Sequence, residues 1–239
     1  MNFAPSAEQQ SFVDSLHKLL ADADGLGAAR AWAAGDTGPG QALWRRLDDL
    51  GVTALALPEE AGGLGAAPID WVLAGEELGH HAVPGAVADR LALVGSDARA
   101  LAGAAQLLGA GRALLETTVE YAGRRTQFGR PIGSFQAVQH QLADALIGIE
   151  FARPLLWRAA VCLADAGTPA SPSVSAAKVA CAQAADRAAR TAIQVHGAIG
   201  YTLECDVSVW FSHIRALIPA DGTPPWHRAR IAEHLRTLP

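Results

Sequence analysis

The stretch YAGRRTQFGRPIGSFQ, from Tyr121 to Gln136, separates two long helical patterns and is the most informative part of the chain. Two adjacent arginines end the first pattern, and Gly129, Pro131 and Gly133 then break the helix. A guanidinium group keeps its charge, and its planar set of donors matches phosphate oxygens. The stretch therefore predicts either a site for a phosphorylated ligand or an ordinary surface turn, and local chemistry favours neither.

Long helical patterns flank this stretch on both sides. Apolar residues recur at helical spacing from Leu101 to Val119. A second helix is expected from about Phe135 to Ala166, with Leu146 on its buried face and a kink or break at Pro154. A third helix, rich in alanine, is expected from near Ser173 to Gly197. Small side chains let helices approach closely, so the pattern predicts a bundle of long antiparallel helices.

The N-terminal part of the chain is also expected to be helical. Ser6 with Gln9 three residues later is typical of a capping box that begins a helix, and Gly51 is expected to end a later one. A further helix is expected from about Pro68 to Leu78, and only Val52 to Leu57 hints at a strand. The sequence therefore predicts an all-α fold with an N-terminal helical domain (residues 1–95) and a C-terminal antiparallel four-helix bundle domain (residues 96–239).

Composition limits the classes of function. The 239 residues carry a formal net charge of −5, which gives no support to a nucleic-acid or anionic-membrane partner. Half of the residues are hydrophobic, and this leaves apolar surface that an oligomer would cover. The N-terminus lacks a secretory signal and no apolar run is long enough to span a bilayer, so a cytoplasmic location is expected. Three cysteines without metal-ligand spacing suit a reducing compartment: Cys162, Cys181 and Cys205.

A second candidate site is the run QVHGAIGYTLE, from Gln194 to Glu204. Gly197 and Gly200 would let a ligand approach the main chain, and the Gln194 amide both donates and accepts hydrogen bonds. The alternative is a simple helix end with a satisfied glutamine, and the run alone favours that alternative.

No metal site is expected from the sequence. Neither His80 with His81 nor His213 with His227 and Asp221 has a recognised zinc spacing.

Taken together, the two runs resemble the flavin-dependent acyl-CoA dehydrogenase family, and LPEEAGGLGA (residues 57–66) resembles that family's N-terminal signature. The resemblance covers almost the whole chain. It implies a dimer in which residues of one subunit contact the FAD of its neighbour. The residues that would make these contacts, by resemblance, are Arg125, Gln127, Phe128, Gln136, Gln194, Gly197 and Ala198, the last of which stands where the family usually has a second glycine.

Two departures from the family pattern matter as much as the matches. The family normally has a β-barrel-like middle domain between its helical parts, and no series of strands occupies that place here. The family also commonly has Glu-Gly-Thr where this chain has Asp221, Gly222 and Thr223, and that glutamate is the base that removes the substrate α-proton. Aspartate is shorter by one carbon–carbon bond, ~1.5 Å, and a misplacement of about 1 Å costs on the order of 10²-fold in rate.

The resemblance and its departures together imply a partner subunit of a heteromeric, FAD-dependent acyl-CoA dehydrogenase that supplies FAD contacts but no catalytic base. Its partner would be a paralogue that contains the β domain, in an α2β2 heterotetramer that shares FAD and acts on an acyl-CoA. By analogy, the substrate would be the CoA thioester of a steroid side chain. Two alternatives remain open: a self-sufficient dehydrogenase that uses Asp221 as its base, and a non-enzymatic helical scaffold or CoA-binding module.

Overall fold

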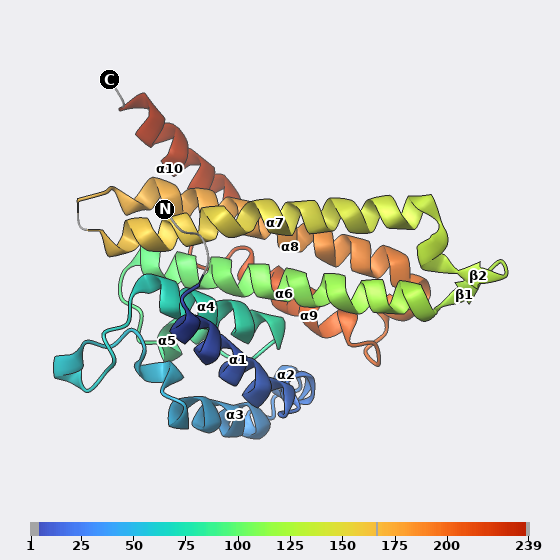
Figure 1. The fold of residues 1–239 in the computed structure, drawn as a ribbon, viewed down its shortest axis with the longest axis horizontal. Coiled ribbons are helices and arrows are strands. Elements are labelled where there is room, and N and C mark those ends of the chain that lie inside the picture. The colour runs from blue at the N-terminus through green and yellow to red at the C-terminus, as the bar shows by residue number, and fades with distance from the viewer. Residues whose placement is uncertain (1–4, 166, 238–239) are drawn as a thin grey trace.

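The computed structural model describes residues 5–165 and 167–237, and it is helical in both parts of the chain (Figure 1). The N-terminal part contains helices α1 to α5 and two short 3₁₀ helices, η1 and η2. Their bounds are α1 Ala7–Ala21, α2 Gly25–Ala33, α3 Gly38–Asp49, η1 Val52–Ala54, η2 Glu59–Ala61, α4 Pro68–His80 and α5 Val87–Arg90.

The C-terminal part contains three long helices and two shorter ones. Their bounds are α6 Ser96–Arg124, α7 Gln136–Ala164, α8 Ala170–His196, α9 Val207–Leu217 and α10 Pro224–Arg236. A two-stranded hairpin, β1 Thr126–Gln127 and β2 Arg130–Pro131, and the 3₁₀ helix η3 Ile132–Ser134 join α6 to α7, while η4 Gly197–Tyr201 follows α8. The three long helices lie side by side, with α7 antiparallel to α6 and α8, and α9 packs against α6 and α8 as the fourth helix (Figure 1). The predicted all-α fold is confirmed.

Several local predictions can be checked against these elements. Ser6 is the N-cap of α1 and forms the expected capping box with Gln9, and Gly51 adopts the left-handed conformation after α3. The predicted helices of the bundle are present, and α7 continues through Pro154 without a break. The strand suggested for Val52 to Leu57 is wrong, because this segment begins with the η1 turn and has no neighbouring strand among the described residues.

Helix α4 is held against α6 by contacts between their backbones. A Cβ atom added at Gly109 of α6 would lie 1.8 Å from the carbonyl oxygen of Glu76, and one added at Gly79 of α4 would lie 2.1 Å from that of Gln106. Any side chain at these two glycines would therefore push the helices apart. The buried apolar residues of α4 and of the bundle consequently form one continuous core.

Not every predicted core position is buried. Leu146 was expected on a buried face, but its exposed fraction is 48%, and Val119, the last residue of the apolar pattern in α6, is 50% exposed. Other apolar side chains of α7 are also exposed, among them Ile147 and Phe151, the latter at 73%. The buried position predicted for Leu146 is therefore wrong, because apolar periodicity does not distinguish a helix face covered within the chain from one left on its surface.

Within residues 5–165 and 167–237, none of the helices combines the length and apolar character needed to cross a membrane.

We expect Gly109→Ala to destabilise the protein by about 1–3 kcal/mol, because the added methyl group overpacks the contact between α4 and α6. Gly123→Ala is the matched control, since Gly123 lies on the same helix and an added Cβ meets nothing within 4 Å. That control should be neutral or stabilising by about 0.5–1 kcal/mol. Urea unfolding followed by circular dichroism measures both changes, and equal stability of the two variants would contradict the packing described here.

Candidate functional site

The predicted phosphate-binding stretch forms a hairpin at one end of the bundle (Figure 1). Thr126 pairs with Pro131 and Gln127 pairs with Arg130 in an antiparallel register. The two residues of the turn, Phe128 and Gly129, have φ angles of 54° and 78°, as expected of the tight turns that suit the twist of a hairpin. Phe128 is 92% exposed at the tip. The turn therefore exposes an aromatic ring that a ligand or a partner could contact.

The hairpin is fixed to the bundle at its base. The backbone N–H of Ile132 donates to the carbonyl oxygen of Arg125 over 2.8 Å. The guanidinium of Arg130 lies 4.1 Å from the ring centre of Phe135, which also contacts the Phe128 ring edge to face at 6.2 Å. These contacts give the exposed residues of the hairpin a defined position relative to the start of α7.

The second predicted run lies at the same end of the bundle. The ring of His196 at the end of α8 stacks on Tyr121 of α6, with ring centres 4.1 Å apart and an angle of 20°. Its Nδ1 lies 2.8 Å from the carbonyl oxygen of Ala192, and burial lowers its pKa. Gly197 then turns the chain with a φ angle of 64°. The structure thus brings together two runs that are about 70 residues apart in the sequence.

Several polar side chains of these two runs have no hydrogen bond or ion pair within the described parts of the chain. Arg124 pairs with Glu120 over 2.7 Å, whereas its neighbour Arg125 has neither an ion pair nor a side-chain hydrogen bond to any described residue. The same holds for the side-chain amides of the predicted cofactor-binding glutamines. All seven predicted residues are exposed: Arg125, Gln127, Phe128, Gln136, Gln194, Gly197 and Ala198. This set fits an anionic ligand with polar groups that arrives from outside the chain.

Asp221 lies in a packed loop between α9 and α10. Its carboxylate accepts a hydrogen bond from Nε of Arg99 over 3.0 Å, and Arg99 also pairs with Asp89. The carbonyl oxygen of Asp221 lies 3.3 Å from Nε2 of the buried His227. A φ angle of 53° places Asp221 in the left-handed region, which non-glycine residues seldom adopt. The carboxylate is therefore held by an arginine and not free.

The loop of Asp221 and the hairpin are at opposite ends of α6. Arg99, which binds Asp221, is in the first turn of the helix, and Arg125 is its C-cap. At 1.5 Å of rise per residue, the helix separates these two arginines by about 40 Å. Asp221 and Arg125 therefore belong to two different sites of this chain.

A histidine cluster that the sequence does not reveal lies between the N-terminal helices and α6. His17 of α1 joins His80 and His81 at the end of α4, although it is more than 60 positions away from them. Burial, followed by the positive charge of Arg112, lowers the pKa of His80 to about 3. Burial and the neighbouring His17 lower the pKa of His81 to about 4. Both lowered pKa values favour the uncharged form of the rings, and no local spacing could have identified His17 as their neighbour.

Comparisons with known families cover nearly the whole chain. Residues 6–97 match the family description "Acyl-CoA dehydrogenase, N-terminal domain", and residues 95–236 match "Acyl-CoA dehydrogenase, C-terminal domain". The two matched segments overlap at residues 95–97, so no residues remain between them for another domain.

Curated relatives differ in how much of their length the chain spans. Acyl-CoA dehydrogenase IpdE2 of Mycobacterium tuberculosis is 29% identical over 87% of this chain and 91% of its own length. The mitochondrial short-chain specific acyl-CoA dehydrogenase of Bos taurus is 32% identical over 82% of this chain but only 45% of its own length. The chain therefore spans less than half of the bovine protein.

Solved structures share the fold at low sequence identity. A chain of the ChsE4-ChsE5 complex from Mycobacterium tuberculosis superposes with a TM-score of 0.85 at 21% identity, covering 100% of both chains. A chain from a variant of the Tcur3481-Tcur3483 steroid ACAD superposes with a TM-score of 0.82 at 20% identity, covering 96% of this chain and 98% of that one.

Proposed function

This chain belongs to the acyl-CoA dehydrogenase family, and we propose that it is a subunit of a heteromeric, FAD-dependent acyl-CoA dehydrogenase that contributes FAD contacts but not the catalytic base. The observation that carries the proposal is the set of unpartnered polar groups at the hairpin end of the bundle. These groups would supply the remaining contacts of a cofactor site that is formed mainly by another polypeptide. In such an enzyme, bound FAD accepts the hydride that leaves the β-carbon of the acyl-CoA.

The residues of the hairpin end fit the groups of FAD. Arg125 supplies an uncompensated guanidinium, whose planar fork suits the oxygens of the pyrophosphate. Gln194 supplies an amide with both donor and acceptor, and the open backbone at Gly197 and Ala198 supports contacts to the adenosine half. Gln127, Phe128 and Gln136 border the same site. In this role the chain binds and orients the cofactor and performs no proton transfer.

Asp221 is not free to act as a base in this proposal. Its carboxylate is paired with Arg99 over 3.0 Å, and its carbonyl oxygen lies 3.3 Å from Nε2 of the buried His227, so both ends of the residue have partners within the chain. The absence of residues between the two matched family segments also supports a partner that supplies a middle domain. Proton removal then belongs to that partner.

The exposed face of α7 supports a stable protein partner. Ile147, Phe151 and Leu155 are 52%, 73% and 40% exposed, and they border a surface groove of about 410 Å³. The charged side chains of Asp144 and Arg187 also line this groove. An apolar centre with a charged rim is the usual composition of an interface between subunits. We assign this face to the paralogue in an α2β2 assembly.

The proposed substrate is the CoA thioester of a steroid side chain. This choice rests on analogy with the steroid ACAD to which the fold is similar. The function itself is tested by acyl-CoA-dependent reduction of an electron acceptor, measured for the chain alone and after co-expression with its paralogue. Only the co-expressed complex should be active, and turnover by the isolated chain would overturn the proposal.

Arg125→Ala should weaken FAD binding by the complex about 10- to 100-fold, since a hydrogen bond to a charged group contributes about 1.5–3 kcal/mol. Arg124→Ala is the matched control, because that guanidinium is already paired with Glu120. Flavin absorbance after gel filtration gives the bound fraction, and the elution volume reports assembly. Unchanged flavin content in Arg125→Ala would refute the assignment.

Asp221→Asn should leave the turnover of the complex unchanged, because the proposal gives Asp221 no role in proton transfer. Asp89→Asn controls for structural effects, since it removes the other carboxylate that pairs with Arg99. Steady-state kinetics of both variants provide the test. A loss of about 10²-fold or more in kcat for Asp221→Asn alone would identify it as a general base.

Phe151→Glu should weaken assembly with the paralogue at least about tenfold, because a charge in the apolar centre of an interface costs more than about 1.4 kcal/mol. Leu235→Glu on α10 is the control, since Leu235 is comparably exposed, at 60%, but outside the α7 face. Analytical ultracentrifugation gives the dissociation constant of each variant from the paralogue, and only Phe151→Glu should bind more weakly than the wild type. If both variants assembled as tightly as the wild type, the α7 face would not be the interface.

A further inference from the structure

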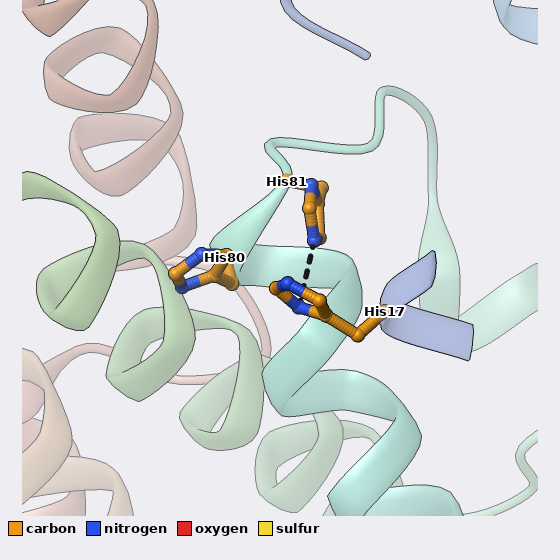
Figure 2. Close-up of side chains that lie close together, drawn as sticks. All are labelled: His17, His80 and His81. Atoms are coloured by element: carbon orange, nitrogen blue, oxygen red, sulfur yellow. Dashed lines mark hydrogen bonds between the residues drawn. The ribbon is translucent and has the colours of Figure 1, made fainter. Parts of the chain in front are cut away.

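Three histidines and two glutamates meet where α1 packs against α4 and α4 packs against α6. The rings of His17, His80 and His81 face one another, with one nitrogen of each ring within 4.8 Å of the others (Figure 2). His17 is on α1, while His80 ends α4 and His81 is its C-cap. The cluster is remote from the hairpin and plays no part in the proposed FAD site.

Three atoms of this cluster have the spacing of ligands around one ion. Nδ1 of His17 lies 3.2 Å from Nε2 of His81 and 2.8 Å from Oε2 of Glu77, and the last two atoms are 3.9 Å apart. A tetrahedral zinc ion with bonds of about 2.0–2.1 Å would place its ligand atoms about 3.3 Å from each other. Two of the observed distances, 2.8 and 3.2 Å, are shorter than this value, and the third, 3.9 Å, is longer.

Hydrogen bonding alone satisfies these atoms poorly. A ring nitrogen carries at most one hydrogen, so a hydrogen on Nδ1 of His17 would have to serve both Glu77 and His81. If His81 donates to Nδ1 instead, a lone pair of His17 faces the carboxylate at 2.8 Å. A cation at the centre of the three atoms would satisfy all of them at once.

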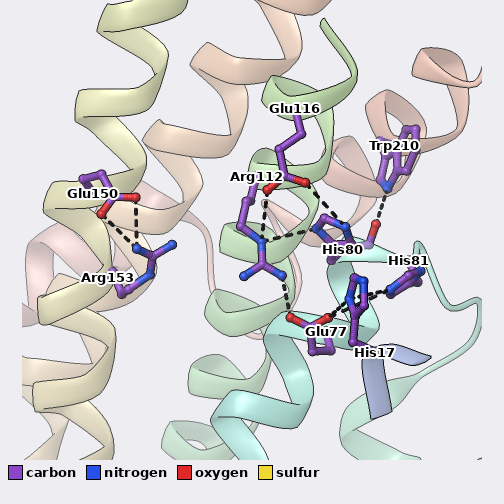
Figure 3. Close-up of polar contacts among 9 residues, drawn as sticks. All are labelled: His17, Glu77, His80, His81, Arg112, Glu116, Glu150, Arg153 and Trp210. Atoms are coloured by element: carbon purple, nitrogen blue, oxygen red, sulfur yellow. Dashed lines mark hydrogen bonds and ion pairs between the residues drawn. The ribbon is translucent and has the colours of Figure 1, made fainter. Parts of the chain in front are cut away.

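The surroundings would orient these ligands and balance the charge. The other oxygen of Glu77 accepts a hydrogen bond from Arg112, which also donates from Nε to Nδ1 of His80 over 3.3 Å (Figure 3). Such outer contacts commonly fix the orientation of metal ligands. Glu116 lies 3.8 Å from Arg112 and adds a second carboxylate, so the carboxylates outnumber the arginine.

A path to the cluster is open. A surface cavity of about 300 Å³ is lined by His80, His81, Glu116 and Trp210, and 49% of the His17 side chain is exposed. His81 is the proposed ligand that lines this cavity, and His17 is reached from the surface, so a hydrated ion could approach the cluster from outside and keep a water as its fourth ligand.

We propose that His17, His81 and Glu77 bind a divalent transition-metal cation, with Zn²⁺ as the best match. Two imidazoles and one carboxylate favour zinc and its neighbours over Mg²⁺ and Ca²⁺, which prefer oxygen ligands. The bound ion would tie α1 to the end of α4 and thereby stabilise the N-terminal helices. This inference does not depend on the proposed redox role.

The test is calorimetric titration of Zn²⁺ into the full chain after treatment with a chelator and removal of the chelator. We expect one ion per chain, a Zn²⁺-dependent rise in Tm, and at least a tenfold weaker affinity in His17→Gln and His81→Gln. His140→Gln and His234→Gln, which replace histidines on the surfaces of α7 and α10, should bind as the wild type does. Co²⁺ absorption spectra should indicate a four-coordinate site.

His17 is half-exposed, so His17→Gln should fold even if changes at His81 do not, and circular dichroism checks this. Absence of Zn²⁺ binding by the wild type would overturn the proposal. So would equal affinity of the wild type and folded His17→Gln, or an equal loss in the two control variants, because both results would place the ion elsewhere.

Discussion

The close contact between α4 and α6 is the constraint on which the rest of the structure depends. Gly79 and Gly109 let the two backbones touch, and neither site leaves room for a side chain. This contact joins the N-terminal helices to the bundle through one core, and it brings Glu77 of α4 next to Arg112 of α6. The position of the histidine cluster and the position of α6 relative to α4 both follow from this contact.

Helix α6 in turn separates two chemically different ends of the chain. At its first turn, Arg99 compensates the carboxylate of Asp221 within the same polypeptide. Beyond its last turn, Arg125 has no compensating charge among the described residues, and the surrounding amides are equally free. The carboxylate of Asp221 is therefore paired within the chain, whereas the hairpin end is suited to an anion supplied from outside. This asymmetry is the physical basis for assigning a cofactor-binding but not a proton-transferring role.

Much of the fold follows from the sequence, because capping residues, glycines and apolar periodicity act locally. Ser6, Gly51 and Gly197 mark helix ends where the structure has them, and the long helices of the bundle are present as expected. The exposure of Leu146 and the position of His17 beside His80 and His81 depend on which surfaces meet in three dimensions. No local sequence pattern encodes these contacts. Proximity of the two runs proposed to bind the cofactor was implied by family resemblance, whereas the unpaired state of Arg125 required the structure.

The central claim is that this chain completes a flavin site owned by another subunit. The most direct measurement is the number of FAD molecules per polypeptide, obtained by native mass spectrometry of the purified chain and of its complex with the paralogue. The account predicts no FAD on the isolated chain and FAD on the heteromeric complex. One FAD on every protomer of the isolated chain would contradict it.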